Sequence, residues 1–105
     1  MTKMIQSLVA LAVVMSLAVA MSFAQSGGEA TYKAKCANCH GATGTPSAGM
    51  AKMMSIKSVS DPAVKALTAA QEFDVVKSGK GKMKPVAGLT DAQIKDVVAF
   101  YRSLK

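Results

Sequence analysis

Both cysteines and the only histidine of this 105-residue chain lie in one five-residue stretch, Cys36-Ala37-Asn38-Cys39-His40. On a helix, Cys36 and Cys39 stand at positions i and i+3 of one face, about 5–6 Å apart at Cβ. Two thiols at this spacing can both reach the vinyl groups on one side of a porphyrin, and His40 can bind the iron from the proximal side. The C-x-x-C-H motif therefore predicts one covalently attached haem c per chain.

Three other interpretations of the motif stay open as weaker alternatives. A dithiol–disulfide redox site of the thioredoxin type would lie in a βαβ unit, and the sequence shows no such pattern. A structural zinc site needs four ligands, whereas this chain offers three within one turn. A disulfide between Cys36 and Cys39 would close so short a loop that it would stabilise the fold little.

The ligand at the sixth iron position decides whether a haem protein transfers electrons or binds gas or peroxide. The chain has no second histidine, so a strong ligand must be methionine or, as a second choice, lysine. Downstream of residue 24 the candidates are Met50, Met53, Met54 and Met83. The first three have the i, i+3, i+4 spacing of side chains that fill a core along one helix. An open sixth site is the alternative to all four.

Met83 is the methionine that helix packing does not explain. It lies in the polar segment Gly-Lys-Gly-Lys-Met-Lys-Pro, 43 residues after His40, which is enough chain to reach the opposite haem face. Pro85 stiffens this loop. We therefore predict His40 and Met83 as the two axial ligands.

The elements that position these residues are predicted to be helices. Residues 29–39 are rich in alanine and lysine and have an acidic residue in the first turn, so they form a first helix. The glycines and Pro46 of residues 41–49 favour a loop. Asp61-Pro62 then marks a helix start, with an N-cap residue followed by proline at the first helical position.

Two capping boxes mark two further helices. Thr68 and Gln71 open one helix, which Gly79 ends before a second loop over residues 79–89. Thr90 and Gln93 open the last helix. Its apolar residues recur at helical spacing: Ile94, Val97, Val98, Tyr101 and Leu104. No segment alternates with period two, so the predicted fold class is all-α, with three to four short helices wrapped around one haem.

The N-terminus has the pattern of an export signal. Lys3 precedes an apolar run over residues 4–21, and small residues permit cleavage after Ala24 or Ala20. We expect a cleaved signal peptide over residues 1–24, a single domain over residues 25–105 and a periplasmic location. An uncleaved anchor is the alternative, because the run approaches the ~20 residues of a membrane span.

The charge balance of the chain predicts acidic partners. Its formal net charge is +7, and loss of Lys3 with the signal leaves +6. Export argues against nucleic acid. Four lysines fall within eight residues, Lys77, Lys80, Lys82 and Lys84. They form either a solvated loop or, if Met83 caps the iron, a docking surface near the haem edge for acidic redox proteins. We expect a monomer. It should associate with membranes only through such partners, unless the signal is retained as an anchor.

After residue 24 the chain resembles small bacterial monohaem cytochromes c with His/Met ligation. The family pattern of glycine, aromatic residue and C-x-x-C-H is matched by Gly28 and Tyr32 ahead of the motif. The resemblance implies a cytochrome c fold in which the last helix crosses the first near Gly28 and Tyr32. Val97 and Phe100 are the contacts that it implies on the last helix.

The resemblance also bears on the surroundings of the iron. It implies that the Pro46 carbonyl accepts a hydrogen bond from the imidazole nitrogen of His40 that faces away from iron. One departure concerns the ligand loop, because many relatives have proline directly after the methionine, whereas Lys84 separates Met83 from Pro85 here.

The function that follows is one-electron transport by a protein that is not an enzyme. One alternative is a haem enzyme or gas-binding protein with an open sixth site. A second is a subunit of a larger oxidase or reductase, if the N-terminal signal is kept as an anchor.

Overall fold

The computed structural model describes residues 27–105, so the predicted signal peptide or anchor lies outside the described residues. Six segments of this range are helical: residues 27–35, α2 (Ala37–His40), α3 (Ala48–Met54), α4 (Pro62–Lys65), α5 (Ala69–Ser78) and α6 (Asp91–Ser103). The predicted all-α class is confirmed. The helical segments outnumber the predicted three to four because Cys36 interrupts the first helix and α3 begins inside the predicted loop. None of the described helices is both long and apolar enough to cross a membrane.

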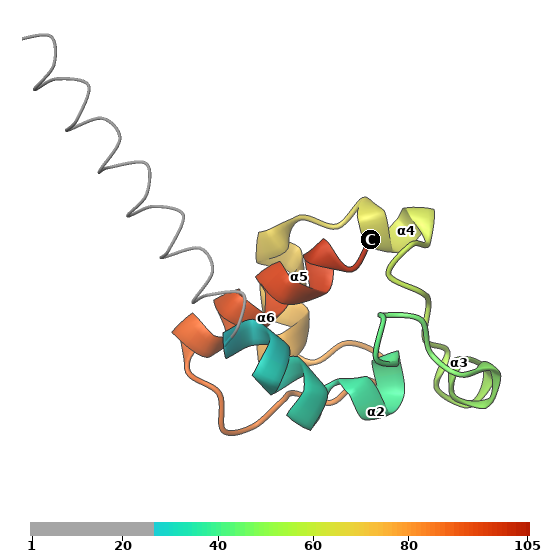
Figure 1. Cartoon of the computed structure of the whole chain (residues 1–105), viewed down its shortest axis with the longest axis horizontal. Helices are drawn as coiled ribbons and strands as arrows, with labels where there is room; N and C mark the ends of the chain where they lie inside the picture. The colour runs from blue at the N-terminus through green and yellow to red at the C-terminus, as the bar shows by residue number, and fades with distance from the viewer. Residues whose placement is uncertain (1–26) are drawn as a thin grey trace, which may run out of the picture.

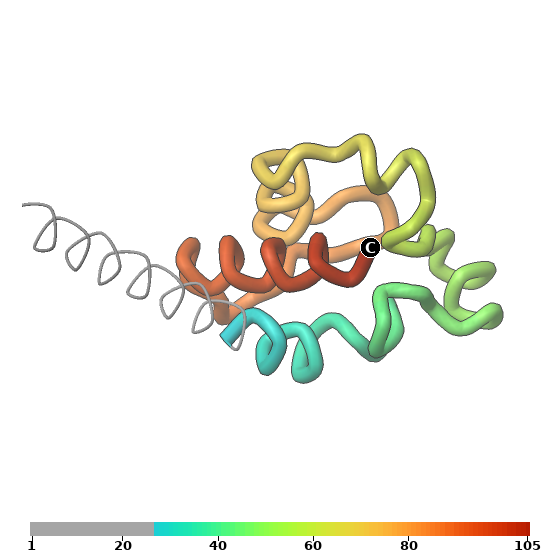
Figure 2. Tube along the Cα trace, turned by 45° about the horizontal axis from the view of Figure 1, so that its top comes forward, coloured from blue at the N-terminus to red at the C-terminus, as the bar shows by residue number. Residues whose placement is uncertain are grey.

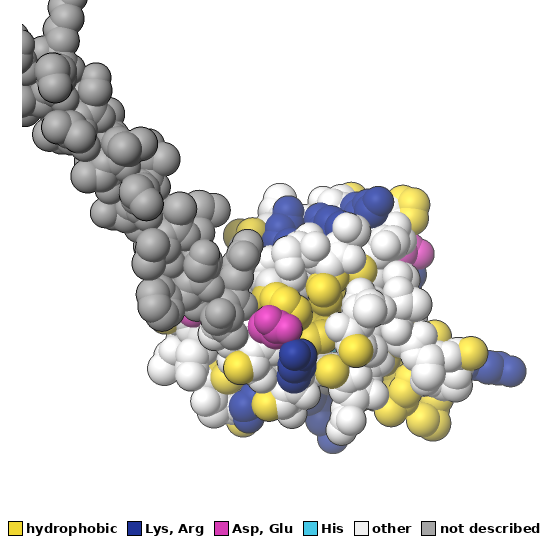
Figure 3. All heavy atoms as spheres, viewed as in Figure 1, with side chains coloured by type: hydrophobic (Ala, Val, Ile, Leu, Met, Phe, Trp, Pro, Cys, Tyr) yellow, Lys and Arg dark blue, Asp and Glu magenta, His cyan; other side chains and the backbone are white. Residues whose placement is uncertain are grey.

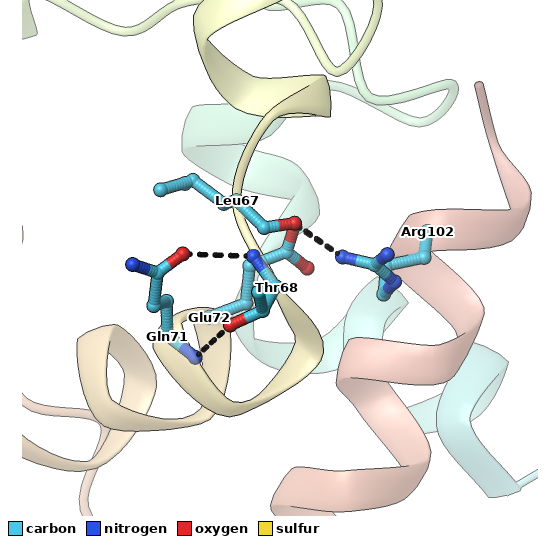
Figure 4. A network of polar contacts seen from close by, with 5 residues as sticks. All are labelled: Leu67, Thr68, Gln71, Glu72 and Arg102. Atoms are coloured by element: carbon cyan, nitrogen blue, oxygen red, sulfur yellow. Dashed lines mark hydrogen bonds and ion pairs between the residues drawn. The ribbon is translucent and has the colours of Figure 1, made fainter.

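The predicted starts of α4, α5 and α6 are confirmed, whereas the first helix, predicted from residue 29, is already helical at residue 27. The Thr68 hydroxyl accepts from the Gln71 N–H at 3.1 Å, and the Gln71 side-chain oxygen accepts from the Thr68 N–H at 2.9 Å (Figure 4). The same reciprocal pair opens α6. At α4 the Asp61 carboxylate accepts from the N–H of Ala63, with proline at the start of the helix. These caps satisfy backbone donors that a helix start leaves without partners.

Helix α6 lies at the centre of the molecule, between the helix over residues 27–35 and α5 (Figures 1 and 2). A Cβ on Gly28 would overlap the Asp96 carbonyl of α6 and lie 3.0 Å from Cβ of Phe100. The rings of Tyr32 and Phe100 pack with centroids 5.4 Å apart. The predicted crossing at Gly28 and Tyr32 is therefore confirmed, with Phe100 in contact and Val97 buried.

The buried apolar core of the described residues consists of only five side chains, Tyr32, Val59, Ile94, Val97 and Val98. Three of them belong to the predicted stripe of α6. A core of this size is small, and domains of this length commonly need a covalent or cofactor link in addition. The fold is thus of the kind that a covalently bound group would stabilise.

A partly buried ion pair fixes α6 against the start of α5. The Arg102 guanidinium donates to the Leu67 carbonyl at 2.8 Å and to the Glu72 carboxylate at 3.1 Å (Figure 4). Glu72 is 6% exposed, and its second carboxylate oxygen accepts no hydrogen bond from the described residues. Burial raises the pKa of Glu72, and Arg102 opposes this effect.

Helix α3 lies at the edge of the molecule, away from α6, and apolar side chains gather over it on the face that Figure 3 shows. Met53 is 64% exposed, and Met50 and Met54 are half-buried. The prediction that helical spacing places these methionines in a core is therefore wrong for Met53. A seven-residue helix at the edge offers only part of its surface to the rest of the fold.

Candidate cofactor site

The two thiols and the imidazole of the motif lie in one helical turn. Cys36 occupies the break between the helix over residues 27–35 and α2, and its carbonyl accepts from the N–H groups of Cys39 (3.2 Å) and His40 (2.9 Å). Both cysteines are free and half-buried. The structure thus gives the compact donor set that attachment of one flat cofactor needs.

The surroundings of Cys36 do not favour a redox dithiol. Burial raises the pKa of the Cys36 thiol, while Lys35 acts in the opposite direction. Reactive dithiols instead need a lowered thiol pKa. No three His, Cys, Asp or Glu side chains between residues 27 and 105 converge as a metal site, which leaves the zinc interpretation without support.

The His40 ring is held by packing. The Tyr101 ring meets it edge to face, with centroids 5.7 Å apart. Burial lowers the pKa of His40, which favours the neutral imidazole that binds metals. Its Nδ1 is buried and has no hydrogen-bond partner among the described residues. Such an atom is rare, and a role in a cofactor site is one physical reason for it.

The hydrogen bond implied from His40 Nδ1 to the Pro46 carbonyl is not formed in the structure. The loop does fold back beside the motif, since the Pro46 nitrogen would lie 3.4 Å from a Cβ on Gly41. The structure therefore places Pro46 close to Gly41, the residue that follows His40, without the implied hydrogen bond to Nδ1.

Tyr32 ties the first helix to the residue after His40. Its hydroxyl donates to the Gly41 carbonyl at 2.5 Å, and burial is the main cause that raises the pKa of Tyr32 to about 12. The sequence identified Tyr32 only as a helix-crossing aromatic residue. The hydrogen bond gives it a second role, because it restrains the chain on the C-terminal side of His40.

The loop that carries Met83 is a tight turn. The N–H groups of Lys80 and Met83 donate to each other's carbonyls at 2.9 and 3.0 Å. Gly81, the first central residue, has φ +58°, in the left-handed region that favours glycine, whereas Lys82 has negative φ. Met83 is half-buried. The turn thus holds the Met83 backbone in a defined position.

Gly79 packs closely against the backbone of this turn. A Cβ on Gly79 would lie 2.7 Å from the Met83 carbonyl oxygen and 2.8 Å from Cδ of Pro85. The N–H of Val86 then donates to the Val76 carbonyl of α5 at 3.0 Å. Lys84 therefore does not disrupt the loop, because Pro85 still packs against Gly79.

The four clustered lysines differ in their surroundings. Lys77 pairs with Asp91 at 2.9 Å, and the Lys82 ammonium donates to the Met53 carbonyl at 3.0 Å. Lys80 and Lys84 are exposed and form no ion pair with a described residue. The segments 30–60 and 75–90, which contain the motif and the Met83 loop, hold eight lysines and no acidic residue. Positive charge is thus concentrated on the two segments with the candidate ligands.

Comparisons with known proteins place the chain among c-type cytochromes. Residues 24–100 match a family model described as cytochrome C oxidase, cbb3-type, subunit III. Among solved structures, the chain is similar to the KustC0563 c-type cytochrome, with a TM-score of 0.66 and 23% sequence identity. That match covers 74% of this chain and 96% of the other. No curated protein matches the chain.

Proposed function

This chain belongs to the c-type cytochrome family described as cytochrome C oxidase, cbb3-type, subunit III, and we propose that it is a periplasmic one-electron carrier. The proposal includes one haem c, bonded to Cys36 and Cys39, with His40 and Met83 as axial ligands. The observation that carries it is the single turn that holds two free thiols and a half-buried imidazole whose Nδ1 atom is buried. When bound, the haem supplies an iron that gains and loses one electron.

The protein's own residues would hold both iron ligands in place. Packing against Tyr101 and the bond from Tyr32 to Gly41 restrain the His40 side. The tight turn and Gly79 restrain the Met83 side. A ligand set that stays bound in both oxidation states suits electron transfer. The chain also lacks a second histidine for acid–base catalysis, so we propose a carrier and not an enzyme.

A mass measurement on the exported protein tests the attachment. We expect the mass of residues 25–105 plus one haem, retained after denaturation in acidic organic solvent. Haem that is extracted from the unmodified chain would contradict the proposal. A mass that includes residues 1–24 would instead show that the signal is retained.

We further propose that acidic redox proteins dock at the exposed lysines beside Met83. Because Lys82 already has a partner and Lys77 is paired, the test uses Lys80→Glu with Lys84→Glu. We expect the electron-transfer rate with an acidic partner to fall with salt, and this double variant to slow it about tenfold at low salt. Reversal of Lys57 and Lys65 changes the net charge equally and serves as the control. Equal losses from both pairs would contradict a docking surface.

A second candidate function is that of a subunit in a larger oxidase, and the match to the family of cytochrome C oxidase, cbb3-type, subunit III favours it. In that case the protein should stay with the membrane fraction after a high-salt wash. Release of the haem-bearing protein with the periplasmic contents would favour the soluble carrier.

A further inference from the structure

The segment that follows His40 and the loop that contains Met83 are joined by one hydrogen bond. Residues 41–60 follow His40, and residues 79–89 contain Met83. Within the described part of the chain, the bond from Lys82 Nζ to the Met53 carbonyl, 3.0 Å long, is the one hydrogen bond between these segments. It spans 29 residues of sequence.

The acceptor of this bond lies at a favourable place for a cation. Helix α3 ends at Met54, its C-cap residue Ser55 has φ +57°, and the Ala51 carbonyl accepts from the N–H groups of both Ser55 and Ile56. The Met53 carbonyl is therefore one of the last carbonyls that no helical N–H reaches. These carbonyls form the negative end of the helix dipole, so the Lys82 ammonium both satisfies an acceptor and meets opposite charge.

The donor of this bond lies directly before Met83. Lys82 is the second central residue of the turn that Lys80 and Met83 close, so its position and that of Met83 are coupled. The backbone hydrogen bonds that hold this loop to another element are to α5. The Gly79 N–H donates to the Val75 carbonyl, and the Val86 N–H donates to the Val76 carbonyl. Without Lys82, the loop would be held on the α5 side alone.

We propose that Lys82 is a positioning residue that ties the Met83 loop to α3 and thereby limits how readily Met83 leaves the iron. The inference rests on the proposed function, in which Met83 is the sixth ligand. Loss of the bond should leave the fold intact and let the Met83 turn move outward more often. Small ligands should then compete with the methionine more successfully.

The test follows displacement of the sulfur ligand by imidazole in the ferric holoprotein. The readouts are the near-infrared charge-transfer band between methionine and iron, and the rate at which imidazole removes it. Lys82→Met removes the donor and should raise this rate about three- to tenfold, the equivalent of one exposed charged hydrogen bond. Lys82→Arg keeps a donor and should restore the rate to within about twofold of the unmodified protein. Lys84→Met removes the same charge on the other side of Met83 and should change the rate by less than about twofold.

Equal rates for Lys82→Met and Lys84→Met would overturn the inference, because charge loss alone would then explain the effect. Failure of Lys82→Arg to restore the rate would overturn it as well. If the unmodified ferric protein shows no sulfur band at all, the proposed His/Met ligation is wrong. The proposed role of Lys82 is then wrong as well, because it depends on Met83 as the sixth ligand.

Discussion

Replacement of Gly79 by alanine should disturb the Met83 loop far more than the same change at Gly81. Both glycines have positive φ, +78° at Gly79 and +58° at Gly81, so both substitutions introduce backbone strain. Only at Gly79 would the new methyl group meet other atoms, the Met83 carbonyl oxygen at 2.7 Å and Pro85 Cδ at 2.8 Å. A Cβ on Gly81 meets nothing within 4 Å.

The difference can be estimated from these contacts. At Gly81 the strain should lower the free energy of unfolding by about 1 kcal/mol. Gly79 has ψ +166°, a region that almost only glycine occupies, and strain there costs about 1–3 kcal/mol. The displaced Met83 carbonyl and Pro85 add to this, so we expect a total loss of about 3 kcal/mol. A difference of about 2 kcal/mol corresponds to about 10 °C in Tm for a domain of this size.

Thermal unfolding of the two holoproteins, followed by the Soret absorption, measures this difference. The near-infrared sulfur band should also weaken in Gly79→Ala and stay unchanged in Gly81→Ala, because only the former moves the Met83 backbone. Equal Tm values and equal band intensities would refute the view that Gly79 supports the ligand loop.

Two further predictions concern residues away from this loop. Tyr32→Phe removes the donor to the Gly41 carbonyl and should lower the free energy of unfolding by about 1–2 kcal/mol in urea titrations; an unchanged midpoint would contradict this. Burial raises the pKa of Glu72 above its unfolded value, so its protonated form stabilises the fold, and that stability is lost as pH rises through the folded pKa. Glu72→Gln should therefore gain stability relative to the unmodified protein as the pH rises above the ordinary carboxyl pKa of about 4, and a difference in Tm that does not change with pH would be evidence against the raised pKa.

Sequence signals between neighbouring residues were sufficient to predict much of the fold. The capping boxes and the Asp61-Pro62 start depend on residues three or fewer positions apart, and the stripe of α6 depends on one helical period. The start of helix α3 was missed because Pro46 and Gly49 outweighed its start signal, the Ser47 side chain that accepts from the N–H of Met50. Composition favoured a loop, whereas the cap and the residues after it favoured a helix.

Contacts between distant segments could not be predicted in the same way. The burial of Glu72 against Arg102 and the bond from Lys82 to Met53 join residues about 30 positions apart, with no periodicity to mark them. In the site, the motif's one-turn geometry follows from adjacent residues and was predictable. The partner of His40 Nδ1 depends on how a separate loop folds back, and the contact implied with Pro46 is not formed.

The near-infrared absorption of the ferric holoprotein tests the central claim most directly, with Met83→Ala compared to Met54→Ala. A charge-transfer band between methionine and iron appears only when the sulfur is bound. His/Met ligation through Met83 predicts this band in the unmodified protein and in Met54→Ala, and its loss in Met83→Ala. A band that persists in Met83→Ala and disappears in Met54→Ala would contradict the assignment of the ligand loop.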